Sequence, residues 1–220
     1  MAARPLRRVK TSAAVVDYLL EQIFSGQLRS GDRIDFDAVG AELGVSRLPV
    51  REALVVLERD GLIATVPHRG SFVEPFDADS ISDDFEILGL LSGVAVARLA
   101  RRRDPEVLAQ LESLLEDLRS SRTIGRASEI VQEIVRAQHR AGGSRRLRAE
   151  LRSYAGFLPW AWQSTRRTHK DIVLAHTKVI DAIVAGDPEA AARHRVEDFR
   201  RAGDDVVKDL VRRGVIERPS

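Results

Sequence analysis

Residues 44–73 have the sequence GVSRLPVREALVVLERDGLIATVPHRGSFV, and their first half has the spacing of a short amphipathic helix. Gly44 permits a left-handed turn, Ser46 can cap the helix, and Pro49 falls in the first turn, where its missing N–H costs nothing. The predicted buried stripe consists of Val50, Ala53, Leu54 and Leu57. The flanks and outer face carry Arg47, Leu48, Arg51, Glu52 and Val55, and they are free to contact another molecule.

After Gly61 the hydrophobic period changes to two. The runs LIATV and SFV are short and β-prone, and the tetrapeptide 67–70, Pro-His-Arg-Gly, joins them. This pattern predicts a β-hairpin with a four-residue tip. The tip places His68 and Arg69 where they can reach a neighbouring molecule.

Two further helices precede this stretch. The first has an apolar stripe at helical spacing and ends near Gly26. The second is framed by Asp35 as N-cap and Gly44 as C-terminal stop. The stripe of the first helix is Val16, Leu19, Leu20 and Ile23. Three helices followed by a hairpin describe a winged helix-turn-helix, in which the third helix fits the major groove of DNA.

The first 76 residues are neutral overall, with nine Arg and one Lys against ten acidic residues, but the basic residues are grouped along the sequence. An acid-free arm at the N-terminus carries Arg4, Arg7, Arg8 and Lys10. Arg47 and Arg51 lie four residues apart at the start of the predicted recognition helix. A basic arm with local arginine clusters suits a phosphate backbone.

Composition excludes several classes of protein. The 220 residues are 44% apolar and 31% charged, with 15 Gly, 8 Pro and a net charge of +2, which indicates an ordinary globular protein. The absence of Cys excludes disulfide scaffolds and thiolate chemistry, so any metal site must use His and carboxylates. The longest uncharged stretch, 153–165, is too short to span a bilayer, and no signal peptide is recognised. We expect a cytoplasmic protein with no membrane contact.

From residue 77 onward the pattern is helical. Segments 103–106 and 186–189 each offer an N-cap Asp, a Pro at the first helical position and a Glu in the first turn. The predicted helices are 77–103, 105–122, 126–141, 145–166, 169–185 and 187–213. Pro159 predicts a kink beside Trp160 and Trp162 in the fourth. The fold class is therefore mainly α, with a winged helix-turn-helix domain (1–74) and an all-helical domain of about six helices (77–220).

The segment 20–73 resembles the DNA-binding domain of the GntR family of bacterial transcription regulators, in which GVSR-x-PVREAL followed by GL and RG-x-xV is highly specific. The helical remainder is similar to the FCD effector-binding domain of that family's FadR branch. The resemblance implies a homodimeric regulator that binds a short palindromic operator in double-stranded DNA and responds to a small organic ligand, often a carboxylate. Its DNA contacts correspond by position to Ser46, Arg47, Leu48, Arg51, His68, Arg69 and Gly70. Leu48 stands where Thr is frequent in the family, and it can contact a thymine methyl group but cannot donate a hydrogen bond.

FCD domains also resemble one another in a metal site, built from an Asp, a His one turn later, and two further histidines. The matching residues here are His139 and His176, whereas Val135 occupies the Asp position and Asp198 the third His position. His194 lies one turn before Asp198 and can substitute or assist. The resemblance thus implies either a divalent Zn or Ni site with a two-His, one-carboxylate set, or a ligand held by hydrogen bonds after loss of the metal.

The first helix of this domain departs from the family pattern as well. Gly89 and Gly93 stand where an Arg and a Glu usually line the ligand cavity. Two interpretations stay open: a wider cavity for a bulkier effector, or a close approach of two helices.

The functional hypothesis is a sequence-specific DNA-binding transcription regulator rather than an enzyme. One alternative is a nucleoid-type DNA binder that senses nothing, which a small affinity ratio between operator and random DNA would indicate. Another is a metal-dependent hydrolase using His139, His176 and Asp198, but no nucleophile motif, Walker loop or dinucleotide fingerprint accompanies them.

Overall fold

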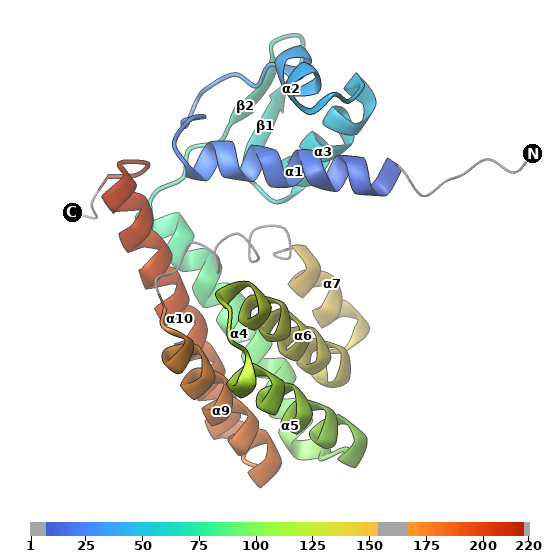
Figure 1. Cartoon of the computed structure of the whole chain (residues 1–220), viewed down its shortest axis with the longest axis vertical. Helices are drawn as coiled ribbons and strands as arrows, with labels where there is room; N and C mark the ends of the chain where they lie inside the picture. Colours follow the sequence, from blue (N-terminus) through green and yellow to red (C-terminus); the bar gives the residue numbers. More distant parts are fainter. Residues whose placement is uncertain (1–7, 154–166, 218–220) are drawn as a thin grey trace, which may run out of the picture. The chain divides into compact units, whose positions relative to one another are not determined.

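The structure, a computed structural model, describes residues 8–153 and 167–217 (Figure 1). The predicted kink at Pro159 beside Trp160 and Trp162 lies outside the described residues, as do Arg4 and Arg7 of the basic arm. In chain order the elements are α1 (Arg8–Phe24), α2 (Phe36–Leu43), α3 (Arg47–Arg59), β1 (Ile63–Val66), β2 (Gly70–Val73), α4 (Ala78–Arg102), α5 (Pro105–Ser120), α6 (Ile124–Gly142), α7 (Arg145–Ser153), α9 (His169–Ala185) and α10 (Pro188–Arg213). The mainly helical fold with one small hairpin is confirmed.

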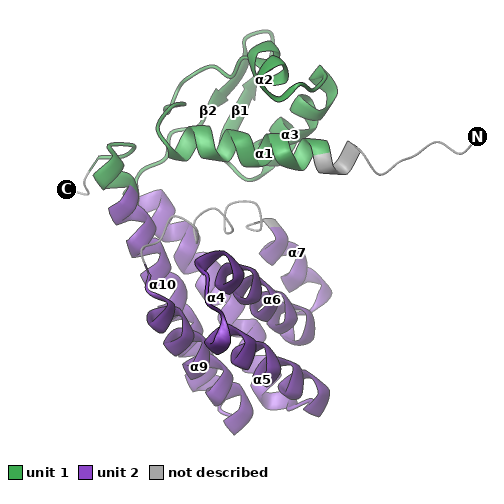
Figure 2. Cartoon of the chain, viewed as in Figure 1, with its two compact units in different colours: residues 1–78, 210–220 green, residues 79–209 purple. Residues whose placement is uncertain are grey.

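The chain divides into two compact units (Figure 2). Unit 1 comprises residues 1–78 together with 210–220, and unit 2 comprises residues 79–209. The sequence prediction assigned residues 210–220 to the helical domain. Because α10 continues as one helix through residue 210, the sequence has no helix end or linker at this division.

Unit 1 is built on the packing of α1 against α3. Leu19 and Ile23 of α1 and Val50 and Leu57 of α3 are buried to within 2% of their surface. Val15, rather than the predicted Val16, completes the α1 side of this core. A short helix is only marginally stable through its own hydrogen bonds. Burial of the aliphatic side chains on these two faces supplies most of the stabilisation.

Caps fix the ends of α2. The Asp35 side chain accepts hydrogen bonds from the backbone N–H groups of Asp37 and Ala38, at 2.9 and 3.0 Å. At the other end Gly44 has φ +62°, a left-handed conformation that glycine adopts at no steric cost. The tight turn then leads directly into α3.

The hairpin is antiparallel, with Ile63 opposite Val73 and Val66 opposite Gly70. Its tip is therefore three residues long, and the prediction of a four-residue tip is wrong because Gly70 already belongs to β2. The backbone N–H of Arg69 donates to the Val66 carbonyl at 3.0 Å, and His68 has φ +62°. Proline at the second position and a positive φ at the third are the features of a type II turn.

Unit 2 is a helical bundle, and its helices α5 and α10 begin at the predicted Asp caps. Asp104 accepts from the Glu106 N–H at 3.1 Å, and Asp187 accepts from the N–H groups of Glu189 and Ala190 at 3.1 and 2.9 Å. A large hydrophobic cluster joins α4, α5, α6, α9 and α10. Of the predicted fourth helix, only α7 lies within the described residues. None of the described helices is long and apolar enough to cross a membrane.

Glycines let α4 approach α10 closely. An ideal Cβ at Gly89 would lie 3.2 Å from Cβ of Phe199 and 3.3 Å from Cα of Val196, and one at Gly93 would lie 3.4 Å from the Ala192 carbonyl oxygen. Of the two interpretations of these glycines, close helix packing is confirmed and the wider cavity is not.

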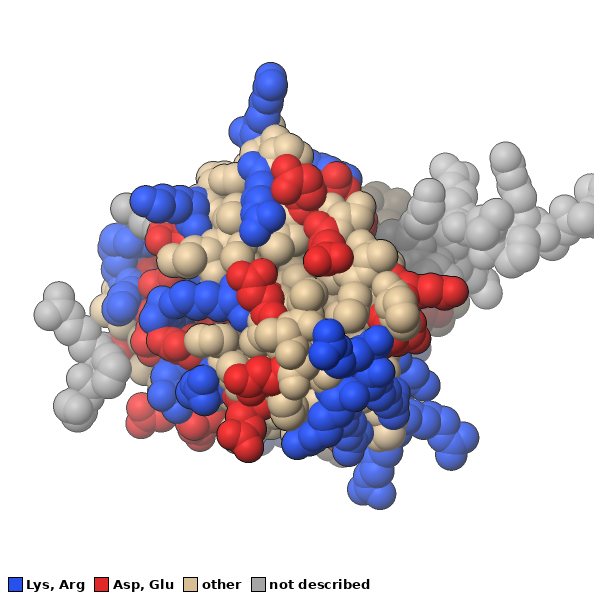
Figure 3. All heavy atoms as spheres, turned by 90° about the horizontal axis from the view of Figure 1, so that it is seen from below, with Lys and Arg blue, Asp and Glu red and all other residues tan. Residues whose placement is uncertain are grey.

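Charged side chains of both signs are spread over the face drawn in Figure 3, with Lys and Arg gathered toward its lower right.

Two arginines bind the end of α6: Arg102 donates to the Ala141 carbonyl at 2.9 Å and Arg148 to the Arg140 carbonyl at 3.1 Å. These guanidinium groups satisfy carbonyls that the helix itself leaves unpaired, and they complement the negative end of its dipole.

Candidate nucleic-acid interface and buried polar cluster

The N-terminus of α3 presents unpaired backbone donors. Ser46 occupies the N-cap with extended backbone (φ −73°, ψ 167°), but its side chain makes no capping hydrogen bond. The expectation that its hydroxyl caps the helix is therefore wrong. The hydroxyl and the first N–H groups of the helix together form an arrangement suited to a phosphate oxygen.

Arg47, the first residue of α3, is held by an acidic residue of α2. Its Nε and Nη2 atoms donate to the two carboxylate oxygens of Asp37 at 2.5 and 2.6 Å. The hydrogen bond and the opposite charge lower the pKa of Asp37 and raise that of Arg47. Both side chains are about two-thirds exposed, so this pair can open to let Arg47 contact another anion.

The outer face of α3 is exposed and mixed in character. Leu48 is 46% exposed and Val55 is 65% exposed, with Arg51 exposed between them. Apolar side chains in this position can contact thymine methyl groups, and an arginine can bind a guanine edge or a phosphate. The predicted face is therefore presented to solvent.

A cleft of about 470 Å³ lies beside the first turns of α3, where residues 33–37 and Gly70 of the hairpin also line it. Three arginines line it: Arg33 precedes α2, and Arg47 and Arg51 lie on α3. Asp35 and Asp37 line it as well. Arg33 pairs with Phe72 in an isolated bridge beside β2, and its Nε lies 2.9 Å from the position that a Cβ at Gly70 would occupy. Gly70 is thus needed for the Arg33 side chain to cross the wing. Arg33 was not predicted, because no sequence pattern places residue 33 beside residue 70.

The wing presents its two predicted basic residues to solvent. His68 and Arg69 are both exposed at the hairpin tip. The tip is supported from below by the Thr65 and Ser71 hydroxyls, 3.0 Å apart, and by Glu58, which accepts from the Thr65 N–H at 3.0 Å. A short, braced hairpin can therefore hold these side chains against a groove or a phosphate.

Unit 2 contains a buried ion pair on α10. Arg195 is fully buried, and its Nη1 donates to Oδ2 of Asp198 at 2.9 Å, while its Nη2 donates to Oε1 of Gln138 on α6 at 2.6 Å. The guanidinium carbon lies 5.7 Å from the centre of the Phe199 ring. Burial lowers the pKa of Arg195 from its ordinary value, but an arginine remains charged in a protein.

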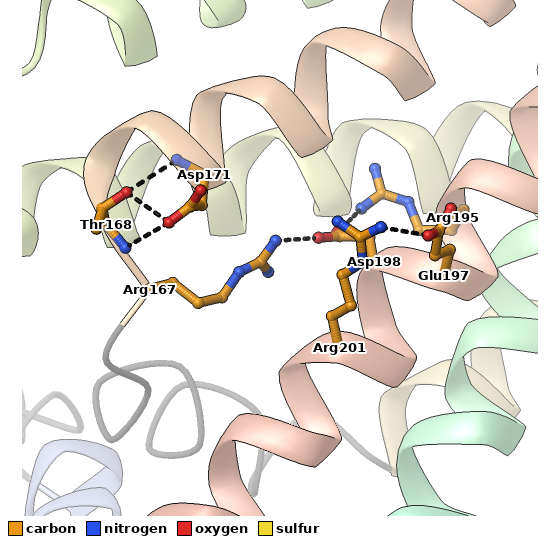
Figure 4. Close-up of polar contacts among 7 residues, drawn as sticks. All are labelled: Arg167, Thr168, Asp171, Arg195, Glu197, Asp198 and Arg201. Carbon is orange, nitrogen blue, oxygen red and sulfur yellow. Dashed lines mark hydrogen bonds and ion pairs between the residues drawn. The ribbon is translucent and has the colours of Figure 1, made fainter.

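A second arginine reaches the same carboxylate from the start of α9. Arg167 donates to Oδ1 of Asp198 at 2.8 Å, so the two guanidinium groups hold opposite oxygens (Figure 4). The next residue, Thr168, forms a capping box with Asp171 that fixes the entry into α9. Burial acts to raise the pKa of Asp198, but His176 and the two arginines outweigh it and hold the pKa below its ordinary value.

The two predicted histidines flank this cluster. His139 on α6 is hydrogen-bonded through Nε2 to the buried Ser92 hydroxyl at 2.9 Å, and His176 on α9 is buried. Burial, reinforced by Arg195, lowers the pKa of His139 to about 4. Burial likewise lowers the pKa of His176 to about 3, although Asp198 opposes the shift. Both imidazoles are therefore neutral at pH 7.

His194 faces a different space. It lines an open cleft of about 290 Å³ between α9 and α10, together with Arg167 and Asp198. Within the described residues its Nδ1 atom is buried and has no hydrogen-bond partner. His194 thus lies on the cleft side of the buried cluster, where Arg167 and Asp198 also line the cleft.

The residues present do not fit a divalent metal ion. Both oxygens of Asp198 are bound by guanidinium groups, and Val135 contributes an apolar side chain where a ligand would be needed. A positive charge, that of Arg195, already lies beside His139 and His176. Among residues 8–153 and 167–217, no group of three or more His, Cys, Asp or Glu side chains is arranged to hold a metal. Among the described residues, His139, His176 and Asp198 are therefore not arranged as metal ligands.

Sequence reasoning missed the residues that organise the cluster: Ser92, Gln138, Arg167 and Arg195. Arg195 follows the candidate His194 directly and lies three positions before Asp198, which is the i, i+3 spacing of an ion pair on one helix face. That spacing was the one available signal. Gln138 lies on α6 and Arg167 just before α9, and neither carried a signal in the sequence.

Comparisons with known proteins agree with this geometry. Residues 11–73 match the family described as bacterial regulatory proteins, gntR family, and residues 83–200 match the FCD domain. An uncharacterised HTH-type transcriptional regulator of Mycobacterium tuberculosis is 35% identical over 96% of this chain and 87% of its own length. The Nta operon transcriptional regulator of Aminobacter aminovorans is 26% identical over 88% of this chain and 92% of its own.

A solved structure shows the same fold. A GntR transcriptional regulator from Rhodococcus sp. RHA1 superposes with a TM-score of 0.60 at 22% identity, covering 90% of this chain and 97% of that chain. The winged helix-turn-helix, the helical unit and the two matched families lead to one conclusion. The chain belongs to the GntR family of DNA-binding transcriptional regulators and carries an FCD domain.

Proposed function

We propose that the protein acts in the cytoplasm as a dimeric, sequence-specific operator-binding regulator whose DNA affinity is set by a small organic ligand in the helical unit. Its DNA contacts are Ser46, Arg47, Leu48, Arg51, His68, Arg69 and Gly70. The observation that carries the proposal is the cleft lined by Arg33, Arg47 and Arg51 beside an exposed α3 face. Arginine side chains and helix N–H groups bind phosphates, while the exposed face contacts base edges.

Dimerisation is proposed through α4. Ile87, Leu90 and Val94 are 43%, 54% and 42% exposed at the i, i+3, i+7 spacing of a single helix face. A second copy of the chain would cover this stripe. Two winged units brought together in this way would suit a palindrome, because one such unit buries too little DNA for high specificity.

The ligand site is proposed at His139, His176, Asp198 and His194, around the buried arginines. His176 and Asp198 are buried and His139 and His194 are partly buried, and together they bridge α6, α9 and α10. A ligand that contacts several helices stabilises one arrangement of them, which is the requirement for coupling to DNA affinity.

The test has two stages. Selection of random DNA by the purified protein should enrich a short palindrome whose affinity exceeds that for random sequence by at least about a thousandfold. A thermal-shift screen of organic acids should then find a ligand that raises the melting temperature and changes operator affinity. A negligible affinity ratio would favour the nucleoid-type alternative.

A further inference from the structure

The segment 31–34 pairs with β2 and places Arg33 at the edge of the wing. Arg33 lies opposite Phe72 in an antiparallel bridge, and the next residue along, Ile34, donates its N–H to the Ser71 carbonyl at 2.9 Å. Backbone pairing of this kind fixes the position and direction of each residue relative to the neighbouring strand. The Arg33 side chain therefore starts from a defined point beside β2.

Gly70 provides the path of this side chain across the wing. Because Arg33 is opposite Phe72, residue 70 is its diagonal neighbour on β2. An ideal Cβ at residue 70 would lie 2.9 Å from Nε of Arg33 and 3.5 Å from its Nη2. Gly70 also has φ +112°, a backbone conformation that other residues rarely adopt. Glycine at this position thus serves the course of the arginine as well as the backbone of the hairpin.

The Arg33 guanidinium is available to an external anion. Within residues 8–153 and 167–217 it makes no hydrogen bond or ion pair, although two carboxylates line the same cleft. Asp37 is already bound to Arg47 through both of its oxygens. Asp35 accepts hydrogen bonds from the first N–H groups of α2. Both acids are therefore committed to other partners.

The cleft remains positive when these acids are counted, because three arginines and two aspartates line it. The pair of Asp37 with Arg47 leaves Arg33 and Arg51 as the guanidinium groups without an ion-pair partner in the described part of the chain. A guanidinium fork matches the two free oxygens of a phosphodiester. An anion of this chemistry is what DNA presents at regular spacing along its backbone.

The position of Arg33 separates it from the residues that read bases. Bases are read by elements that enter a groove, here α3 and the hairpin tip, whereas residue 33 precedes α2 and lies at neither. Contacts made from outside the groove go to phosphates, and they carry no sequence information. Arg33 is therefore placed to hold the DNA backbone.

We propose that Arg33 is a further DNA-contact residue, which binds a backbone phosphate at this cleft along the path that Gly70 leaves open. This inference rests on the proposed function, since it adds to its DNA contacts a residue outside the set predicted from the sequence and gives that residue a sequence-independent role. The contact contributes equally to operator and random DNA. It positions the wing on the duplex without selecting the site.

The test measures DNA affinity at several salt concentrations by fluorescence anisotropy, with the full-length protein on an operator duplex and on a random duplex of equal length. We expect Arg33→Gln to lower the slope of log affinity against log salt by about one on both duplexes. The ratio of operator to random affinity should stay at the wild-type value. Arg33→Lys keeps a positive charge at this position and should restore the slope.

Arg29→Gln is the matched control. Arg29 is exposed, its side chain has no partner among the described residues, and it lies outside the lining of the cleft. The control makes the same change in net charge as Arg33→Gln and should keep the wild-type slope. The proposal is overturned if Arg33→Gln keeps that slope as well, or if Arg29→Gln lowers it equally, since net charge alone would then explain the effect. A loss confined to the operator would overturn the phosphate contact in favour of a base contact.

The two proposals can fail separately, because random DNA alone reports on the phosphate contact. A wild-type protein without preference for any operator would overturn the proposed function, while the slope of Arg33→Gln on random DNA would still decide the role of Arg33. Sequence-specific binding with a slope that does not depend on Arg33 would overturn the phosphate contact alone.

Discussion

Asp37 and Arg47 are joined by two parallel hydrogen bonds, from Nε to Oδ1 and from Nη2 to Oδ2, across the turn between α2 and α3. Arg47 begins the proposed recognition helix, so the same guanidinium cannot bind Asp37 and a phosphate with this edge at once. The DNA-free protein therefore holds one of its principal cations in an internal pair. DNA must displace a carboxylate before this arginine becomes available.

Asp37→Asn should strengthen DNA binding. The substitution releases Arg47 and removes a negative charge from the cleft, so the slope of log affinity against log salt should steepen by about one. Affinity is measured by fluorescence anisotropy at several salt concentrations. Glu42→Gln, an exposed residue of the same helix, makes an equal change in net charge and serves as the control. Equal salt slopes in wild type and Asp37→Asn would show that the pair does not limit binding.

Arg51→Ala should weaken operator binding by about 1 to 3 kcal/mol if the side chain contacts a base, with a smaller loss for random DNA. If Arg51 binds a phosphate instead, the loss should be equal for both DNAs and the salt slope should fall by about one. Titrations of operator and random duplexes distinguish the two roles. Unchanged affinity in a folded variant would remove Arg51 from the interface.

Leu90→Glu should convert a dimer into a monomer, because it places a charge in the apolar stripe of α4. Light scattering at micromolar concentration checks the mass, and operator affinity should fall as the two half-sites are no longer bound together. Leu174→Glu is the matched control, since Leu174 is 50% exposed on α9 and lies outside the stripe. A wild-type protein that is monomeric both alone and with operator would contradict the proposed interface.

Acid should destabilise the protein through His139 and His176. Their pKa values are lowered from 6.5 to about 4 and about 3 in the folded state, so the unfolded state binds more protons below pH 6.5. The stabilisation from these groups is complete above pH 6.5 and is lost as pH falls toward the folded values, at up to about 1.4 kcal/mol per pH unit for each histidine. Urea unfolding between pH 7 and 4.5 measures the slope. His176→Gln should flatten it, and a parallel profile would count against the buried, neutral imidazole.

Gly89→Ala and Gly93→Ala should change the free energy of unfolding in opposite directions. A Cβ at Gly89 meets Phe199 and the Val196 backbone at 3.2 and 3.3 Å, so overpacking should cost about 1 to 3 kcal/mol. The nearest atoms to a Cβ at Gly93 lie at 3.4 Å, and there the better helix propensity of alanine should offset the contact. Chemical denaturation of both variants gives the comparison. Equal stabilisation by the two would show that α4 and α10 can separate without cost.

The winged helix-turn-helix could be predicted because its signals are local. Gly44, the cap at Asp35 and the apolar stripe of α3 each depend on residues a few positions apart, and backbone sterics and helix periodicity decide them before any long-range contact forms. The same holds for the Asp-Pro starts of α5 and α10. The family motif added the DNA-contact residues, which face outward for the same periodic reason.

The buried cluster could not be predicted, because its partners are distant in sequence. Arg195 lies on a helix rich in charged residues, and only the packing of α6 and α9 against α10 removes it from water. Its bonds run to Gln138, 57 positions away, and to Asp198, which also binds Arg167 across 31 positions. Helix periodicity determined which residues face inward. Only the tertiary structure decided that the Arg195 guanidinium is buried between Gln138 and Asp198, since burial of a charge depends on partners that sequence spacing does not contain.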